Sequence, residues 1–128
     1  MKKINYKSAG VDIDAGNQAV NKIKSKVRST FSSDVLTGIG GFGSLYNLKK
    51  ILAEYSEPIM VQSIDGVGTK TIIARKMKKY DTIGIDLLSA AANDILVMGA
   101  KPLTFLDYIA NDKLDPDVVD QIVSGMVY

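Results

Sequence analysis

A long apolar stretch, residues 83–100, constrains the fold of this 128-residue sequence more than any other feature. Asp86, Asn93 and Asp94, which are nearly its only polar residues, interrupt it. Because charged groups are costly inside a lipid bilayer, the stretch does not predict a membrane-spanning segment. It predicts a largely buried helix over residues 83–99, ended by Gly99 and Pro102. A chain of this length can enclose such a helix in the core of one domain.

Asp86, Asn93 and Asp94 together suggest a metal ion. Spacings of seven and eight residues return Asn93 and Asp94 to the side of the helix that carries Asp86. They could face water or bond to neighbouring backbone, but buried carboxylates without partners are costly, and convergence on a cation would explain them. The sequence contains neither cysteine nor histidine, so carboxylates would have to hold the ion. A hard ion such as Mg²⁺ fits that donor set.

The second informative motif is Asp65-Gly66-Val67-Gly68-Thr69-Lys70. It follows a predicted strand over residues 59–64 and leads into a predicted helix over residues 69–79, whose buried side would carry Ile72, Ile73 and Met77. The glycines let the backbone turn sharply and approach a ligand. Free N–H groups and the dipole at a helix start favour anions.

The chemistry of this motif leaves two interpretations open. In one, Asp65 holds a metal ion and Lys70 neutralises phosphate charge, so that Asp65 and Asp94 share one Mg²⁺ that bridges phosphate oxygens. In the other, the motif is a glycine turn with a capping Asp65 and a solvated Lys70. The motif is not a Walker A loop, because G-x-x-x-x-G-K-[ST] is absent.

A glycine run, Gly38-Ile39-Gly40-Gly41-Phe42-Gly43, matches the spacing G-x-G-x-x-G. The context of a dinucleotide-binding turn is missing, because no convincing strand precedes Gly38 and no clear helix follows. The run predicts either a flexible loop or a loop whose backbone N–H groups approach phosphates.

The remaining segments complete an α+β order of elements. Residues 1–14 predict a flexible arm, and Asp14 would cap a helix over residues 15–30. A strand is expected over residues 103–110, with Asp107 in an apolar setting, and a final helix begins at Asp115-Pro116. The formal charge of +2 is too small to indicate a nucleic-acid-binding protein.

Several motifs, in order, resemble aminoimidazole ribonucleotide synthetase, also called phosphoribosylformylglycinamidine cyclo-ligase. They cover almost the whole chain: Tyr6-Lys7-Ser8-Ala9-Gly10-Val11-Asp12-Ile13-Asp14-Ala15-Gly16-Asn17, Gly40-Gly41-Phe42-Gly43, Asp65-Gly66-Val67-Gly68-Thr69-Lys70, Asp81-Thr82-Ile83-Gly84-Ile85-Asp86-Leu87, Asn93-Asp94 and Phe105-Leu106-Asp107-Tyr108. Several motifs in register are far more specific than any one of them.

The resemblance implies a ligase that forms a C–N bond in purine biosynthesis. Such an enzyme uses ATP and Mg²⁺ to close formylglycinamidine ribonucleotide to aminoimidazole ribonucleotide, releasing ADP and phosphate. It implies an α+β amino-terminal ATP-binding domain, a mixed sheet flanked by helices, and sheets that pair across a homodimer. It also implies a cytoplasmic protein without nucleic-acid or membrane partners.

The resemblance also assigns roles to residues. Asp65 and Asp94 would bind the metal, and Lys70 would contact ATP phosphates and, with these two carboxylates, take part in catalysis. The rest of the nucleotide contacts would come from Gly40, Gly41, Phe42, Gly43, Gly66, Val67, Gly68, Thr69 and Asn93. The arm around residues 7–14 and the Gly40–Gly43 loop would cover the nucleotide or the substrate phosphate. Asp86 and Asp107 are candidates for proton transfer.

The sequence departs from that family in length. The family enzyme continues with a Gly-Gly-Glu-Thr motif and a second domain, so residues 1–128 are expected to be a truncated amino-terminal domain, inactive alone. One alternative is another ATP-using relative, such as selenophosphate synthetase, thiamine-phosphate kinase, a hydrogenase maturation factor or formylglycinamidine ribonucleotide synthetase. Another is a non-catalytic dimerisation or nucleotide-binding module.

Overall fold

The computed structural model describes residues 5–128 and is built from helices joined by long extended segments. Its elements are the 3₁₀ helix η1 (Lys7–Ala9) and the α-helices α1 (Ile13–Ser29), α2 (Lys49–Glu54), α3 (Lys70–Met77), α4 (Asp81–Leu96) and α5 (Pro116–Val127).

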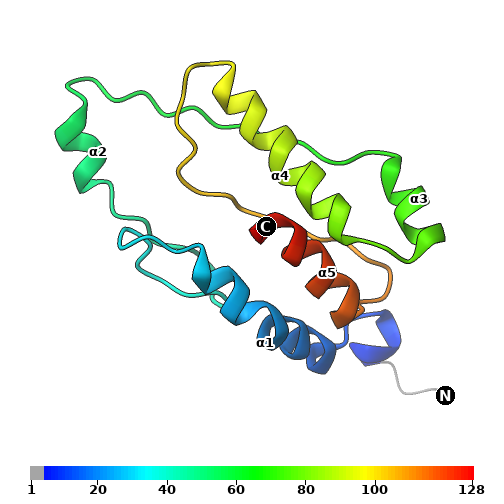
Figure 1. The fold of residues 1–128 in the computed structure, drawn as a ribbon. Helices are drawn as coiled ribbons and strands as arrows, with labels where there is room; N and C mark the ends of the chain where they lie inside the picture. The colour runs from blue at the N-terminus through cyan, green and yellow to red at the C-terminus, as the bar shows by residue number, and fades with distance from the viewer. Residues whose placement is uncertain (1–4) are drawn as a thin grey trace.

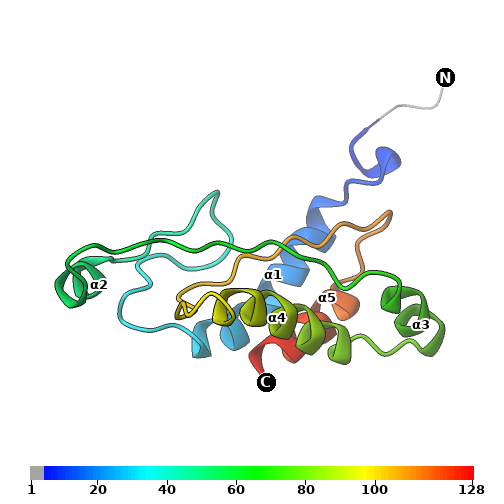
Figure 2. The same cartoon turned by 90° about the horizontal axis from the view of Figure 1, so that it is seen from above.

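The elements form two layers. Helix α5 lies between α1 and α4, and these three helices make one layer (Figure 1). The extended segments around residues 57–67 and 101–110 run across one face of that layer (Figure 2). The small helices α2 and α3 lie at opposite ends of the molecule.

Helix α1 begins at a capping aspartate. The Asp12 carboxylate accepts hydrogen bonds from the backbone N–H groups of Asp14 and Ala15, both at 3.1 Å, which satisfies donors at the helix start. The prediction that Asp14 is the cap was therefore wrong by two residues. The predicted arm is also shorter than expected, because η1 and the start of α1 fall within it; its residues 1–4 lie outside the described part of the chain.

Helix α5 begins as the sequence predicts. Asp115 caps it by accepting from the N–H of Asp117, and Pro116 occupies the first turn, where a missing N–H costs nothing. Its buried residues Val119 and Val123 pack against Ala19 of α1, and this cluster is the centre of the hydrophobic core.

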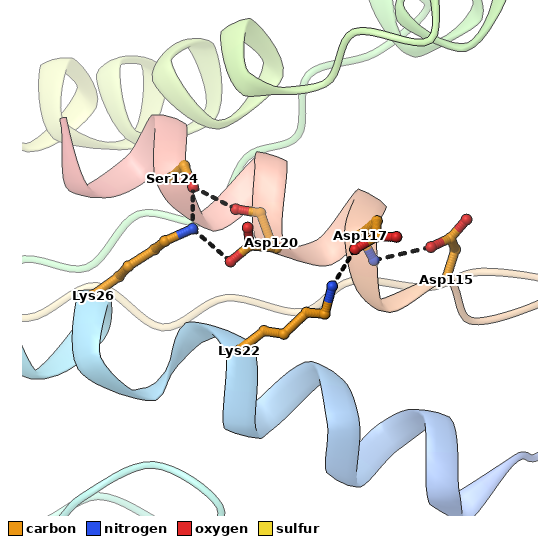
Figure 3. A network of polar contacts seen from close by, with 6 residues as sticks. All are labelled: Lys22, Lys26, Asp115, Asp117, Asp120 and Ser124. Carbon is orange, nitrogen blue, oxygen red and sulfur yellow. Dashed lines mark hydrogen bonds and ion pairs between the residues drawn. The ribbon is translucent and has the colours of Figure 1, made fainter.

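Polar contacts line the edge of the α1–α5 interface (Figure 3). Lys26 donates to the Asp120 carboxylate at 2.5 Å and to the Ser124 hydroxyl at 2.8 Å, while Lys22 pairs with Asp117. Both lysines lie on the same side of α1, one turn apart, and both contacts join that side to α5.

Helices α4 and α5 cross at two glycines. A Cβ atom added to Gly84 would lie 1.9 Å from the backbone oxygen of Ile122, and one added to Gly125 would lie 1.8 Å from that of Asp81. Both glycines are buried. Only residues without a side chain allow the two backbones to approach this closely.

The predicted strands were wrong for the described residues. Within residues 5–128 no strand is formed, and the one β-bridge is an isolated antiparallel contact between Val35 and Tyr46. Residues 59–64 and 103–110 are extended but have no neighbouring strand to complete a ladder. Their apolar side chains remain open to solvent, as the exposures of Ile59 (87%) and Ile64 (98%) illustrate.

Burial of α3 and α4 also differs from the prediction. Ile72, Ile73 and Met77 of α3 are exposed, and the buried residue of this helix is Ala74. Helix α4 buries Ile83, Gly84 and Ala91 against α5, but its C-terminal end is exposed. Gly99, with φ of +72°, follows the helix end as predicted.

Candidate functional site

The Asp65–Lys70 motif forms a turn that leads directly into helix α3. Gly68 has φ of +63°, a left-handed conformation that other residues adopt only with strain. The Gly68 oxygen accepts from the Thr71 hydroxyl at 3.0 Å, and Lys70 is the first residue of the helix. No side chain caps α3, and the N–H groups of Thr71 and Ile72 bond to the backbone oxygens of Gly68 and Thr69, at 3.5 and 3.0 Å.

Lys70 is held by a carboxylate of the neighbouring helix. Its Nζ lies 2.8 Å from Oδ2 of Asp86 on α4. Because both side chains are largely exposed, at 57% and 42%, the ion pair is weak and an incoming anion can replace Asp86. Asp86 therefore acts in this structure as the partner of Lys70.

The other end of the motif is also attached to α4. The Ser63 hydroxyl donates to Oδ2 of Asp94 at 2.8 Å, while Oδ1 of Asp65 accepts from the N–H of Gly66 at 2.6 Å. Residues 63 and 65 of an extended segment face the same side. That alternation would place Asp65 on the side of Ser63, but Asp65 is exposed and its carboxylate bonds to Gly66 rather than to α4.

The two predicted metal ligands suit Mg²⁺ in chemistry but form only part of a coordination shell. Asp65 and Asp94 offer hard, exposed carboxylate oxygens. Among residues 5–128 there is no group of three or more side chains that could hold a metal ion. Mg²⁺ commonly binds one or two carboxylates and takes its other ligands from water and phosphate, so the residues present fit such an ion.

The Gly40–Gly43 loop lies beside α1. Gly40 has φ of +98°, and a Cβ atom added there would lie 3.6 Å from Cγ1 of Val20. Phe42 is fully exposed, and in the described chain no hydrogen bond joins this loop to the Asp65–Lys70 turn. Asn93 is exposed on α4 next to Asp94.

Residues before α1 and at its start border two hollows in the described part of the chain. A cavity of about 590 Å³ is lined by the start of α1 and by the segment before α5, with Asn17, Tyr108 and Asn111 among its residues. None of its lining residues belongs to the Asp65–Lys70 turn. In the described chain, this cavity therefore lies apart from the Asp65 carboxylate and the turn that carries it.

Two carboxylates near this arm have shifted pKa values. A hydrogen bond from Lys7, 2.9 Å from Asp12, holds the pKa of Asp12 below its ordinary value, and the same contact raises the pKa of Lys7. Desolvation of its carboxyl group raises the pKa of Asp107, partly opposed by a hydrogen bond from the N–H of Tyr108. In the described residues no side-chain hydrogen bond joins Asp107 to another residue, and its role in proton transfer stays a prediction.

Sequence reasoning missed Ser63 as a site residue. Its only signal is position, two residues before Asp65 in an extended segment, and its partner Asp94 lies 31 residues away in the chain.

No helix within residues 5–128 combines the length and apolar character needed to cross a lipid bilayer.

Comparison with known proteins finds relatives whose descriptions agree with one another. A family model described as AIR synthase related protein, N-terminal domain, matches residues 50–128. Phosphoribosylformylglycinamidine cyclo-ligase of Carboxydothermus hydrogenoformans is 55% identical over 126 residues, which covers 98% of this chain and 36% of the relative. The enzyme of the same description from Trichlorobacter lovleyi is 54% identical over 121 residues, covering 94% and 34%. The chain therefore spans about a third of the length of the curated relatives it matches.

Proposed function

The chain belongs to the AIR synthase related protein family, as its N-terminal domain, and from this premise we propose that it provides the ATP-binding part of a phosphoribosylformylglycinamidine cyclo-ligase. The observation that carries the proposal is the attachment of the Asp65–Lys70 turn to α4 at both ends, by Ser63–Asp94 and Lys70–Asp86. These contacts hold Lys70 and Asp94 on one helix, on either side of the turn that carries Asp65. In the proposal the two carboxylates would bind a cation, and Lys70 and the backbone of the turn would meet phosphate. The high identity to cyclo-ligases over almost the whole chain supports the same conclusion.

The proposed reaction closes the imidazole ring of formylglycinamidine ribonucleotide. The formyl oxygen of the substrate attacks the γ-phosphorus of ATP, a P–O bond forms, and ADP leaves. The neighbouring nitrogen then attacks the activated carbon, the C–N bond forms, and the C–O bond breaks as phosphate departs with that oxygen. Two protons are lost as the ring closes, one of them to the departing phosphate, and a proton shifts from the ring CH2 group to the exocyclic nitrogen to give aminoimidazole ribonucleotide.

The residues of this chain would bind and orient the nucleotide. The backbone of Gly66, Val67, Gly68 and Thr69 would approach the phosphates, and Lys70 would exchange Asp86 for a phosphate oxygen. Asp65 and Asp94 would hold Mg²⁺, which when bound supplies positive charge to the phosphate oxygens. Asn93 and the Gly40–Gly43 loop are proposed as further nucleotide contacts, and the arm around residues 7–14 as a cover.

Thermal unfolding tests the nucleotide site. A ligand that binds only the folded chain raises its free energy of unfolding by RT ln(1 + [L]/Kd), so Mg-ATP at about a hundredfold excess over its Kd adds about 2.7 kcal/mol. The parent chain should melt higher with Mg-ATP than with ATP plus a chelator, and Asp65→Asn should lose that difference. Asp117→Asn, which removes another exposed carboxylate, on α5, should keep it. An equal shift for the parent and Asp65→Asn would rule out this site.

A homodimer in the cytoplasm is part of the same proposal. The exposed apolar side chains of the two extended segments support it, since Ile59, Ile64, Leu106 and Tyr108 are each more than three-quarters exposed. Extended backbone without ladder partners favours pairing with another chain. Analytical ultracentrifugation should give a concentration-dependent dimer that Ile64→Lys weakens. A monomer at all concentrations would contradict the proposed homodimer and the pairing role of the two extended segments.

A further inference from the structure

The Asp65–Thr69 turn is attached to helix α4 on both sides, by Ser63 before it and by Lys70 after it. Asp86 and Asp94 are eight residues apart on α4, which separates them by about 12 Å along its axis. The segment from Ser63 to Lys70 could span about 23 Å if fully extended. Because the segment is longer than the distance it bridges, chain length alone does not set its position. The two side-chain contacts, Ser63–Asp94 and Lys70–Asp86, set it.

The Ser63 contact differs in kind from the Lys70 contact. A hydroxyl is a neutral donor, so Ser63 brings no opposite charge to Asp94 while it holds one of its oxygens, Oδ2, at 2.8 Å. No hydrogen bond of residues 5–128 uses Oδ1 of Asp94, and the residue is exposed. The hydroxyl therefore restricts rotation of the carboxylate without competing for its charge, and it leaves one oxygen for an outside ligand.

We propose that Ser63 is a positioning residue of the nucleotide site, whose hydroxyl orients the Asp94 carboxylate and draws the Asp65 turn toward it. This role rests on the proposed function, since it gives Asp94 a cation to face. Outer partners that orient a metal-binding carboxylate typically change metal affinity by about 10- to 100-fold when removed. The exposed setting of Asp94 favours the lower end, about tenfold.

The experiment compares the parent chain with Ser63→Ala, Ser63→Thr and Ser89→Ala. Threonine retains the hydroxyl, and Ser89 is an exposed serine of α4 that forms none of the observed side-chain hydrogen bonds of the described chain. ATP affinity is measured with Mg²⁺ and with a chelator, and the ratio of the two Kd values is the readout. Hydrogen–deuterium exchange of residues 64–68 is recorded without nucleotide.

Ser63→Ala should lower the Mg²⁺-dependent ratio about tenfold and speed exchange of residues 64–68, with the unfolding midpoint unchanged. Ser63→Thr should restore most of both, and Ser89→Ala should match the parent. A purely structural role would move the midpoint and leave the ratio alone. If the parent shows Mg²⁺-dependent binding and Ser63→Ala keeps it within twofold, the positioning role is overturned alone. If the parent shows no such binding, the proposed function fails and this role fails with it.

Discussion

Replacing Gly84 by alanine tests the close crossing of α4 and α5. The new Cβ atom would lie 1.9 Å from the backbone oxygen of Ile122 and 2.9 Å from the backbone nitrogen of Met126. Real Cβ atoms essentially never approach a heavy atom within 3.0 Å, so the helices must separate locally by about 3.0 − 1.9 = 1.1 Å. Backbone atoms cannot move aside as the end of a flexible side chain can.

The expected loss follows from that displacement. A gap of about 1 Å removes up to about half of the dispersion energy of each contact across it, and overpacking of this kind costs about 1–3 kcal/mol. Alanine regains about 1 kcal/mol through its higher helix propensity. Taking the upper end of the packing cost, the net loss is about 2 kcal/mol, or a melting temperature lower by about 8 °C at about 4 °C per kcal/mol.

The assay is thermal and urea unfolding followed by circular dichroism, with Gly16→Ala as the control. Gly16 is also a helical glycine, but a Cβ atom there would meet Leu114 Cδ2 at an ordinary 3.9 Å. Gly16→Ala should therefore raise stability by up to about 1 kcal/mol through propensity alone. If Gly84→Ala unfolds at or above the parent midpoint, the close crossing is not a determinant of this fold.

Three further substitutions test the polar contacts of the molecule. Lys26→Met should lower the free energy of unfolding in urea by about 1 kcal/mol, because it removes two half-buried contacts to α5. Lys22→Met removes a more exposed contact and should leave the urea midpoint unchanged. Equal effects of the two substitutions would contradict this ranking. The hydrogen bond from Lys7 lowers the pKa of Asp12, so the ionised carboxylate stabilises the fold fully above pH 3.8 and loses this effect as the pH falls through the lowered pKa. Below that pKa, the melting temperatures of the parent and Asp12→Asn should converge. Burial raises the pKa of Asp107, so its ionisation destabilises the fold as pH rises from 3.8 through the raised pKa; Asp107→Asn should melt higher than the parent at neutral pH and equally below pH 3.8.

The helices could be predicted from the sequence because their signals are local. Asp115-Pro116 marks the start of α5, Gly99 marks the end of α4, and both lie within a few residues of the helix they delimit. The first helix was placed correctly but its cap was not. Asp12 and Asp14 are both good caps, and the choice depends on the η1 turn and its contact between Lys7 and Asp12.

The strands could not be settled from the sequence in the same way. Alternation and β-branched residues in 59–64 indicate an extended chain, and the chain there is extended. A strand also needs a neighbour that completes its hydrogen bonds, and residues 5–128 provide none for this segment or for 103–110. The buried side of α3 was wrong for a related reason, because which face of a short helix is covered depends on its partner.

In the candidate site, too, the spacing along one helix could be predicted from the sequence, whereas the contacts between distant segments could not. Helical spacing correctly placed Asp86 and Asp94 two turns apart on one helix. Which of them meets Lys70 and which meets Ser63 depends on the path of the extended segment across α4, and no local pattern carries that information. Gly84 and Gly125 were overlooked as well, since a glycine that permits a helix crossing looks like any other until the second helix is in place.

Calorimetric titration with Mg-ATP measures whether the Asp65–Lys70 turn and α4 together bind a metal-bound nucleotide. The chain should bind one Mg-ATP per protomer, and Lys70→Met and Asp94→Asn should each weaken binding at least tenfold, whereas Lys22→Met should bind like the parent. Binding that survives both substitutions unchanged, or no binding by the folded parent chain, would contradict the account.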